Sequence, residues 1–277
     1  MEDADIVELM EKAREIRITT IDAIGRSGGG HIGGSMSIVE VLVILYYKYL
    51  RIDREDPRKK DRDRVVLSKG HAGPALYAIL ADLGFFPKDW LLTLNEGGTR
   101  LPSHCDMNQT PGIDMSTGSL GHGLSAAVGM ALGLRLDGID STVYAIIGDG
   151  ECHEGQIWEA AMSAAHFKLH NLVVFADYNK MALDGYIDEV MDLNDLSSKW
   201  VAFGWHTQRV DGHNFNQLER AIDKALKEPL RPSMIIVDTV KRKGCSFAEG
   251  KIGSHKMPFS CSDAEEAIAQ LSGKGGK

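Results

Sequence analysis

The sequence predicts an α/β protein whose parallel sheet is covered by helices on both faces. Short apolar runs rich in β-branched residues, typical of buried strands, alternate along the chain with longer segments that have helical spacing. Regular alternation of these two kinds of element indicates parallel strands that are joined by helical crossovers.

The amino-terminal part is predicted to be mainly helical. Apolar residues recur at helical spacing over 6–24, and the glycines at 28–30 break this helix before His31. A second helix is predicted over 35–50, with Ser35 or Ser37 as its N-cap. The next predicted elements are a mixed-charge loop over 51–64, a strand over 65–67, a helix over 74–83 and an irregular loop over 97–116.

The rest of the chain is expected to supply most of the sheet. The predicted elements are helices over 125–136, 156–167 and 215–226, and strands over 143–147, 172–176, 201–210 and 234–239. We expect residues 1–277 to form a single domain, with a flexible tail from about residue 266.

Size and charge limit the possible functions. A chain of 277 residues is long enough for one large α/β domain. Its net charge of −8 argues against nucleic acid as the main partner. No signal-like segment is seen, and the longest apolar run, over 38–47, is too short to span a bilayer. The four cysteines lack CxxC spacing, which is typical of free thiols, so we expect a cytoplasmic protein without a membrane partner.

Polar residues follow two neighbouring strands of the predicted sheet. Asp149, between Gly148 and Gly150, comes just after the strand over 143–147, and Asn179 follows the strand over 172–176. Open α/β sheets bind ligands at this edge. One carboxylate and one amide oxygen suit a Mg²⁺ ion that also holds phosphate oxygens. The glycines allow a diphosphate to approach the backbone.

A Gly-Asp-Gly segment followed at a distance by Asn resembles the thiamine diphosphate motif, and the surrounding residues resemble the transketolase family. The matching segments are Ser27-Gly-Gly-Gly-His31, Ser68-Lys-Gly-His71, Pro102-Ser-His104 and Gly118-Ser-Leu-Gly-His-Gly123. The resemblance extends from about Ile16 to His255 and concerns the amino-terminal, diphosphate-binding half of that enzyme. It implies the thiamine diphosphate-binding fold, with this chain as the diphosphate-binding (PP) domain.

The resemblance implies that the chain binds thiamine diphosphate and Mg²⁺. Asp149, Asn179 and the backbone carbonyl of Met181 are the implied metal ligands. Glu154 would lie at a subunit interface, in a proton network between two active sites. The implied cofactor-binding residues are His71, Gly118, Ser119, Leu120, Gly148, Asp149, Gly150, Glu154, Asn179 and His255.

Four histidines lie in loops rich in Gly, Pro or Ser, and the resemblance places them in the active site as catalytic residues. They are His31, His71, His104 and His255. Histidine suits proton transfer at sugar hydroxyl and carbonyl oxygens because its ordinary pKa is near neutrality. The alternative for each is a hydrogen-bonded structural role. Arg100 is a candidate for contact with a substrate phosphate.

No second series of strands and helices remains for a pyrimidine-binding domain. The resemblance therefore implies a split transketolase, a heterotetramer in which a C-terminal transketolase subunit supplies that domain and this chain self-associates through its PP domain. Such an enzyme moves a two-carbon ketol unit from a ketose to an aldose. The substrates are sugars or sugar phosphates, and we expect the ketose donor to be phosphorylated. The alternatives are a subunit of a 2-oxoacid dehydrogenase or deoxyxylulose-phosphate synthase type enzyme, and a noncatalytic regulatory subunit.

Overall fold

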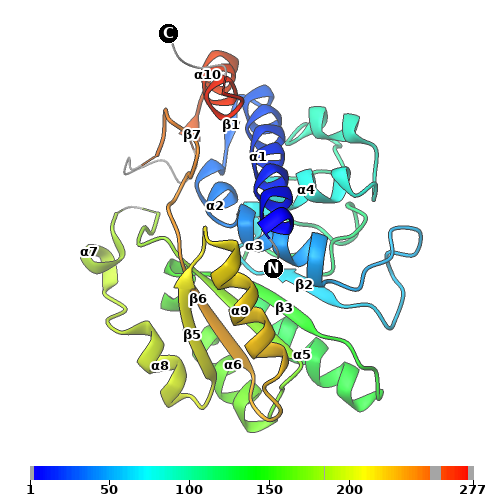
Figure 1. Cartoon of the computed structure of the whole chain (residues 1–277), viewed down its shortest axis with the longest axis vertical. Coiled ribbons are helices and arrows are strands. Elements are labelled where there is room, and N and C mark those ends of the chain that lie inside the picture. Colours follow the sequence, from blue (N-terminus) through cyan, green and yellow to red (C-terminus); the bar gives the residue numbers. More distant parts are fainter. Residues whose placement is uncertain (1–2, 184, 250–256, 274–277) are drawn as a thin grey trace.

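The computed structural model describes residues 3–183, 185–249 and 257–273 and contains a five-stranded parallel sheet (Figure 1). The strand order is β2-β3-β4-β6-β5. The strands are β2 (Arg64–Leu67), β3 (Val143–Gly148), β4 (Leu172–Tyr178), β5 (His206–Asp211) and β6 (Ser233–Asp238). The predicted parallel sheet is confirmed.

Helices cover both faces of this sheet, as predicted. Alternate residues of β3 point to opposite sides, so Tyr144 and Ile146 join one apolar core while Ala145 and Ile147 join the other. The first core includes α1 (Asp3–Arg26), α2 (Ile32–Ser37), α3 (Val39–Ile44), α4 (Gly73–Asp82) and α9 (Phe215–Leu226). The second includes α5 (His122–Leu136), α6 (Gly155–His166), α7 (Ile187–Met191) and α8 (Leu196–Ala202).

The carboxyl ends of the central strands lie level with one another. Gly148 in β3 pairs with Asp177 in β4, and Asp177 pairs with Val237 in β6. The segments that follow these three strands therefore leave the sheet at the same edge. Short helical turns lie outside the sheet: η2 (Gly70–Ala72), η3 (Lys88–Thr93) and η4 (Gly150–His153).

The helix predicted over 35–50 is wrong in its start and continuity. The structure has α2, a break at Ile38, α3, and a π-helical turn η1 (Leu45–Tyr49). Neither serine is an N-cap, because both lie inside α2. The Ser35 hydroxyl donates to the His31 carbonyl at 2.8 Å. Every residue from 32 to 46 is buried, so no polar face marks the break in the sequence.

The strand predicted over 201–210 is wrong in its first part. Residues 196–202 form α8, and the strand begins only at His206. Asp195 caps the helix by accepting the Ser197 N–H at 3.0 Å, and Leu196 and Trp200 form its buried stripe. Gly204, at φ +85°, reverses the chain between helix and strand.

The expected flexible tail from about residue 266 is also wrong, because residues 261–271 form helix α10 (Cys261–Leu271). Ser260 and Asp263 form a capping box at its start. Ala264 and Ala267 are buried. Ala264 packs closely on α1, because a Cβ added at Gly25 would lie 2.7 Å from the Ala264 Cβ. Nearby, β1 (Gly29–Gly30) pairs antiparallel with β7 (Met257–Pro258). The loop predicted over 97–116 has no helix or strand, as expected.

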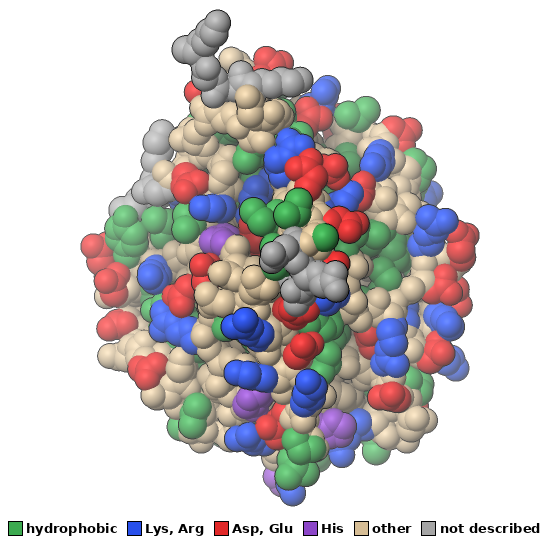
Figure 2. Space-filling model, viewed as in Figure 1, with side chains coloured by type: hydrophobic (Ala, Val, Ile, Leu, Met, Phe, Trp, Pro, Cys, Tyr) green, Lys and Arg blue, Asp and Glu red, His purple; other side chains and the backbone are tan. Residues whose placement is uncertain are grey.

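On the face shown in Figure 2, acidic and basic side chains are interspersed and hydrophobic side chains gather in small groups. The net negative charge is thus not concentrated in one area of this face. Within the described ranges, no helix has the length and apolar character needed to cross a bilayer.

Candidate active site

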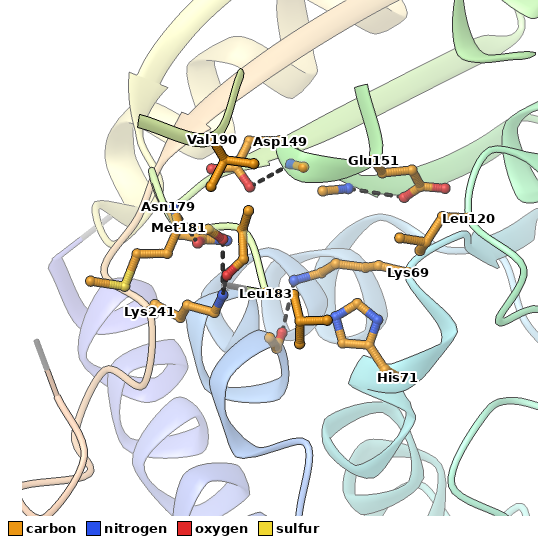
Figure 3. A pocket seen from close by; sticks show the side chains of 14 residues that line it. Lys69, His71, Leu120, Asp149, Glu151, Asn179, Met181, Leu183, Val190 and Lys241 are labelled. Carbon is orange, nitrogen blue, oxygen red and sulfur yellow. Dashed lines mark hydrogen bonds between the residues drawn. The ribbon is translucent and has the colours of Figure 1, made fainter. Parts of the chain in front are cut away.

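A cavity of about 290 Å³ opens at the carboxyl edge of the sheet (Figure 3). Seven of the residues expected from sequence line it: His71, Leu120, Gly148, Asp149, Gly150, Asn179 and Met181. Lys69, Glu151 and Lys241 line it as well and were not assigned a role from sequence. The structure thus gathers loops that follow β2, β3, β4 and β6 around one space.

Asp149 lies just after β3 and is 2% exposed. Its carboxylate accepts the N–H groups of Gly150 at 2.8 Å and Lys180 at 2.6 Å. Burial, and then the nearby charge of Asp177, raise the pKa of Asp149 to about 7. A cation at this carboxylate would favour its ionised form, so the environment of Asp149 fits a metal ligand.

Asp177, the residue before Tyr178 at the end of β4, fixes the orientation of Asn179. The Asn179 Nδ2 donates to Asp177 Oδ2 at 2.9 Å, and Oδ1 accepts the Met181 N–H at 3.2 Å. An amide oxygen has two lone pairs, so Oδ1 keeps one for another partner. Asp177 is fully buried and also accepts hydrogen bonds from Ser37, Lys69 and Thr239. Burial opposes ionisation, but the Lys69 charge and these hydrogen bonds outweigh it and lower the pKa of Asp177.

The carbonyl of Met181 completes a set of oxygen groups at the cavity. It accepts a hydrogen bond from Lys241 Nζ at 2.8 Å and so already faces positive charge (Figure 3). One carboxylate, one amide oxygen and one carbonyl oxygen are the ligand types that Mg²⁺ prefers. The donor atoms of Asp149, Asn179 and Met181 therefore fit the expected metal.

The two lysines of the cavity have different partners. Lys69 Nζ is paired with the Asp177 carboxylate and also donates to the Gly34 carbonyl at 2.8 Å. Lys241 Nζ donates to the carbonyls of Met181 and Ala182, and across the described ranges no carboxylate lies within ion-pair distance of it. Burial lowers the pKa of Lys241 to about 8. Lys241 is thus the cavity lysine whose charge a bound anion would neutralise.

A sequence signal for Lys241 existed but was missed. Like Asp149 and Asn179, it follows closely after a predicted central strand, at the edge where ligands bind.

Glu151 joins three of the sequence motifs. Its buried carboxylate accepts the Ser68 hydroxyl and the N–H groups of Gly121 at 2.8 Å and Gly148 at 3.1 Å. Burial is the main cause that raises the pKa of Glu151. Two of these motifs also pack closely on each other, because a Cβ added at Gly123 would lie 2.4 Å from Ser68 Oγ. The sequence carries no signal for this role, because an acidic residue after Gly-Asp-Gly equally suits a helix start.

Three of the predicted catalytic histidines lie together. The ring centroid of His31 is 5.5 Å from that of His71 and 5.3 Å from that of His104. The Ser103 hydroxyl lies 3.3 Å from His31 Nδ1. His71 lines the cavity, so the cluster extends from it. His255 lies outside the described residues.

Other predicted residues lie away from the cavity lining. Gly118 packs beneath the His104 ring at φ +143°, where an added Cβ would be 3.0 Å from the ring. Ser119 is exposed, and Glu154 is exposed at the start of α6. Arg100 stacks over the Trp90 ring at 4.9 Å and lines two separate hollows. Direct contact of these residues with cofactor or substrate stays a prediction.

Known proteins resemble the chain in both fold and sequence. Transketolase from Leishmania mexicana superposes with a TM-score of 0.90 at 30% identity, over 95% of this chain and 41% of that enzyme. The 6-deoxy-6-sulfo-D-fructose transketolase subunit SqwG of Clostridium sp. (strain MSTE9) is 53% identical over 97% of this chain and 98% of its own length. An apulose-4-phosphate transketolase subunit from Actinobacillus succinogenes is 36% identical, over 95% and 96% respectively.

A family profile described as "Transketolase, thiamine diphosphate binding domain" matches residues 9–274. Together with the parallel sheet and the cavity at its edge, this match defines the class as an α/β thiamine diphosphate-binding domain. Within that class the chain belongs to the transketolase family of transferases. It spans about two fifths of the solved single-chain enzyme but nearly the full length of the relatives named as subunits.

Proposed function

We propose that this chain is the diphosphate-binding subunit of a two-subunit transketolase that moves a two-carbon ketol unit from a ketose to an aldose. The observation that carries the proposal is the group of oxygen donors from Asp149, Asn179 and Met181 beside the ammonium of Lys241. A cation and a diphosphate need these two kinds of partner side by side.

Each residue has a defined task in this proposal. Asp149, Asn179 and the Met181 carbonyl hold Mg²⁺, and Lys241 binds the diphosphate. When bound, thiamine diphosphate supplies stabilisation of the carbanion formed during ketol transfer. Leu120, just before α5, lines the same cavity and is proposed to contact the cofactor.

The cluster of His31, His71 and His104 holds and moves protons at the hydroxyl and carbonyl oxygens of the donor sugar. Three neighbouring imidazoles can share these roles because each ring carries a donor and an acceptor when neutral. A cluster of this kind favours sugar substrates over the 2-oxoacids of related thiamine diphosphate enzymes.

The remaining half of the enzyme is proposed to be a C-terminal subunit with the pyrimidine-binding domain, in a cytoplasmic heterotetramer that self-associates through the PP domains. Support comes from relatives of equal length that are named as subunits. The proposed donor is 6-deoxy-6-sulfo-D-fructose, because the SqwG relative is 53% identical and the apulose-4-phosphate relative 36%. Both named substrates are anionic sugars.

The test is reconstitution with the pyrimidine-binding subunit encoded nearest to this chain. Ketol transfer would be measured with 6-deoxy-6-sulfo-D-fructose, fructose 6-phosphate and apulose 4-phosphate, with thiamine diphosphate and Mg²⁺ supplied. We expect turnover that requires both subunits and is fastest with the sulfonated donor. Preference for a phosphorylated donor would correct the substrate. Absence of transfer from all three, in a complex shown to be folded, would refute the transketolase assignment.

A further inference from the structure

A buried polar cluster lies on the side of the sheet opposite α5 and α6, and none of its members lines the cavity. Glu40 of α3 accepts hydrogen bonds from Arg17 of α1 at 2.7 Å and from His213 Nδ1 at 3.0 Å. Arg17 and Glu40 are 6% and 7% exposed. Burial opposes ionisation of Glu40, but the bonds from His213 and Arg17 outweigh it and lower its pKa to about 2. Glu40 is thus a carboxylate that fixes the His213 ring.

The second ring nitrogen of His213 binds the chain beyond β6. The Val240 N–H donates to His213 Nε2 at 2.9 Å. Since Nε2 accepts, the proton of the neutral ring is on Nδ1, where it is donated to Glu40. Glu40 therefore fixes the tautomer as well as the orientation that the Val240 N–H requires.

His213 provides a hydrogen-bond acceptor just beyond the end of the sheet. The last paired residues of β5 and β6 are Asp211 and Asp238, so the backbone after Asp238 has no strand partner on this side. Gly212 N–H donates to the Asp238 carbonyl at 2.8 Å, and His213 then supplies the next acceptor. The turn after β5 therefore continues the hydrogen bonding between β5 and β6, and it holds the segment that follows β6.

The residue next to Val240 is Lys241, which is 5% exposed and reaches the cavity. We propose that His213, oriented by Glu40, is a positioning residue that places Lys241 for diphosphate binding. His213 itself does not line the cavity and acts through the backbone of Val240. This inference rests on the proposed function for the role of Lys241 in binding, but not for the Val240 contact.

The experiment compares three variants in the reconstituted complex. His213→Phe keeps a ring without hydrogen-bonding groups, whereas His213→Gln keeps one donor and one acceptor. His206→Phe is the matched control, because His206 bonds Ser233 at the opposite ends of β5 and β6. Thiamine diphosphate affinity at saturating Mg²⁺ is measured by calorimetry. We expect His213→Phe to weaken binding by about three- to tenfold, His213→Gln to recover much of this loss, and the control to bind normally.

A double variant separates positioning from general stability. If His213 acts through Lys241, adding His213→Phe to Lys241→Met should weaken binding no further than Lys241→Met alone. A full multiplication of the two losses would overturn the inference, as would normal affinity in His213→Phe or an equal loss in His206→Phe.

Amide hydrogen exchange tests the contact independently of cofactor. In the purified chain without thiamine diphosphate, His213→Phe should speed exchange in a peptide that contains Val240 and Lys241, and His206→Phe should not. Unchanged exchange there would overturn the inference whatever the affinity data show. If the wild-type complex bound no thiamine diphosphate, the proposed function would fail while this exchange measurement still judged the His213 contact.

Discussion

At the scale of single residues, Asp149 is the position where we expect a substitution to weaken cofactor binding most. It is buried, it is held by two backbone N–H groups, and it is the carboxylate among the three oxygen groups proposed to bind the cation. We expect Asp149→Ala to abolish Mg²⁺-dependent binding of thiamine diphosphate, because the remaining two groups are neutral.

The measurement for Asp149→Ala is calorimetric titration of the reconstituted complex, with the melting temperature as the check on folding. Asp195→Ala, which removes the exposed cap of α8, is a control that should leave cofactor affinity unchanged. Normal affinity in Asp149→Ala would remove this residue from the metal site.

His104 is exposed in an irregular loop, and its ring meets that of His31. We expect His104→Ala to lower kcat/KM for the ketose by about 10²–10⁴-fold, the usual contribution of a positioned acid–base group. Cofactor affinity should change little, since His104 does not line the cavity. Steady-state kinetics at saturating cofactor provide the measurement. A collapsed melting temperature would instead indicate a structural role.

At the scale of elements, the start of α5 packs closely on Ser68, just after β2, because residue 123 is a glycine. A Cβ at Gly123 would lie 2.4 Å from Ser68 Oγ and 2.6 Å from Ser68 Cα, whereas one at Gly129 in the same helix would meet nothing within 4 Å. The two positions thus form a matched pair, because both are helical glycines and only one is crowded.

We expect Gly123→Ala to reduce the free energy of unfolding by about 1–3 kcal/mol, as overpacking typically does. Gly129→Ala should increase it by roughly 0.5–1 kcal/mol, because alanine favours the helix. Chemical denaturation of the purified chain measures both. Equal effects at the two positions would show that the Gly123–Ser68 approach does not limit packing.

At the largest scale, the length of the chain bears on the proposal of a two-subunit enzyme. The chain covers about two fifths of the solved single-chain transketolase, and its relatives of equal length are named as subunits. We expect the purified chain to have no ketol-transfer activity until the pyrimidine-binding subunit is added. Titration of one subunit with the other, followed by the rate of ketol transfer, provides the test. Turnover by a sample free of the partner would contradict the split-enzyme proposal.

Sequence patterns alone predict the parallel sheet and the edge of the sheet at which Asp149 and Asn179 lie. Buried strands show as continuous apolar runs, and residues just after two such runs, Asp149 and Asn179, must meet at one edge of a parallel sheet. These sequence patterns are local, so they can be recognised without knowing the contacts between distant segments. Resemblance added the family, which the comparisons confirmed.

The partners of these residues depend on contacts between segments that are distant in the sequence. Lys69 pairs with Asp177, whereas Lys241 donates to backbone carbonyls. Asp177 also fixes the orientation of the Asn179 amide. The His213 ring accepts the N–H of Val240, which lies 27 positions later in the chain. Local patterns also missed the break at Ile38, where every surrounding residue is buried, and missed α10, which packs on α1. Spacing along a chain reports its own periodicity, whereas contacts between distant segments depend on strand register and packing.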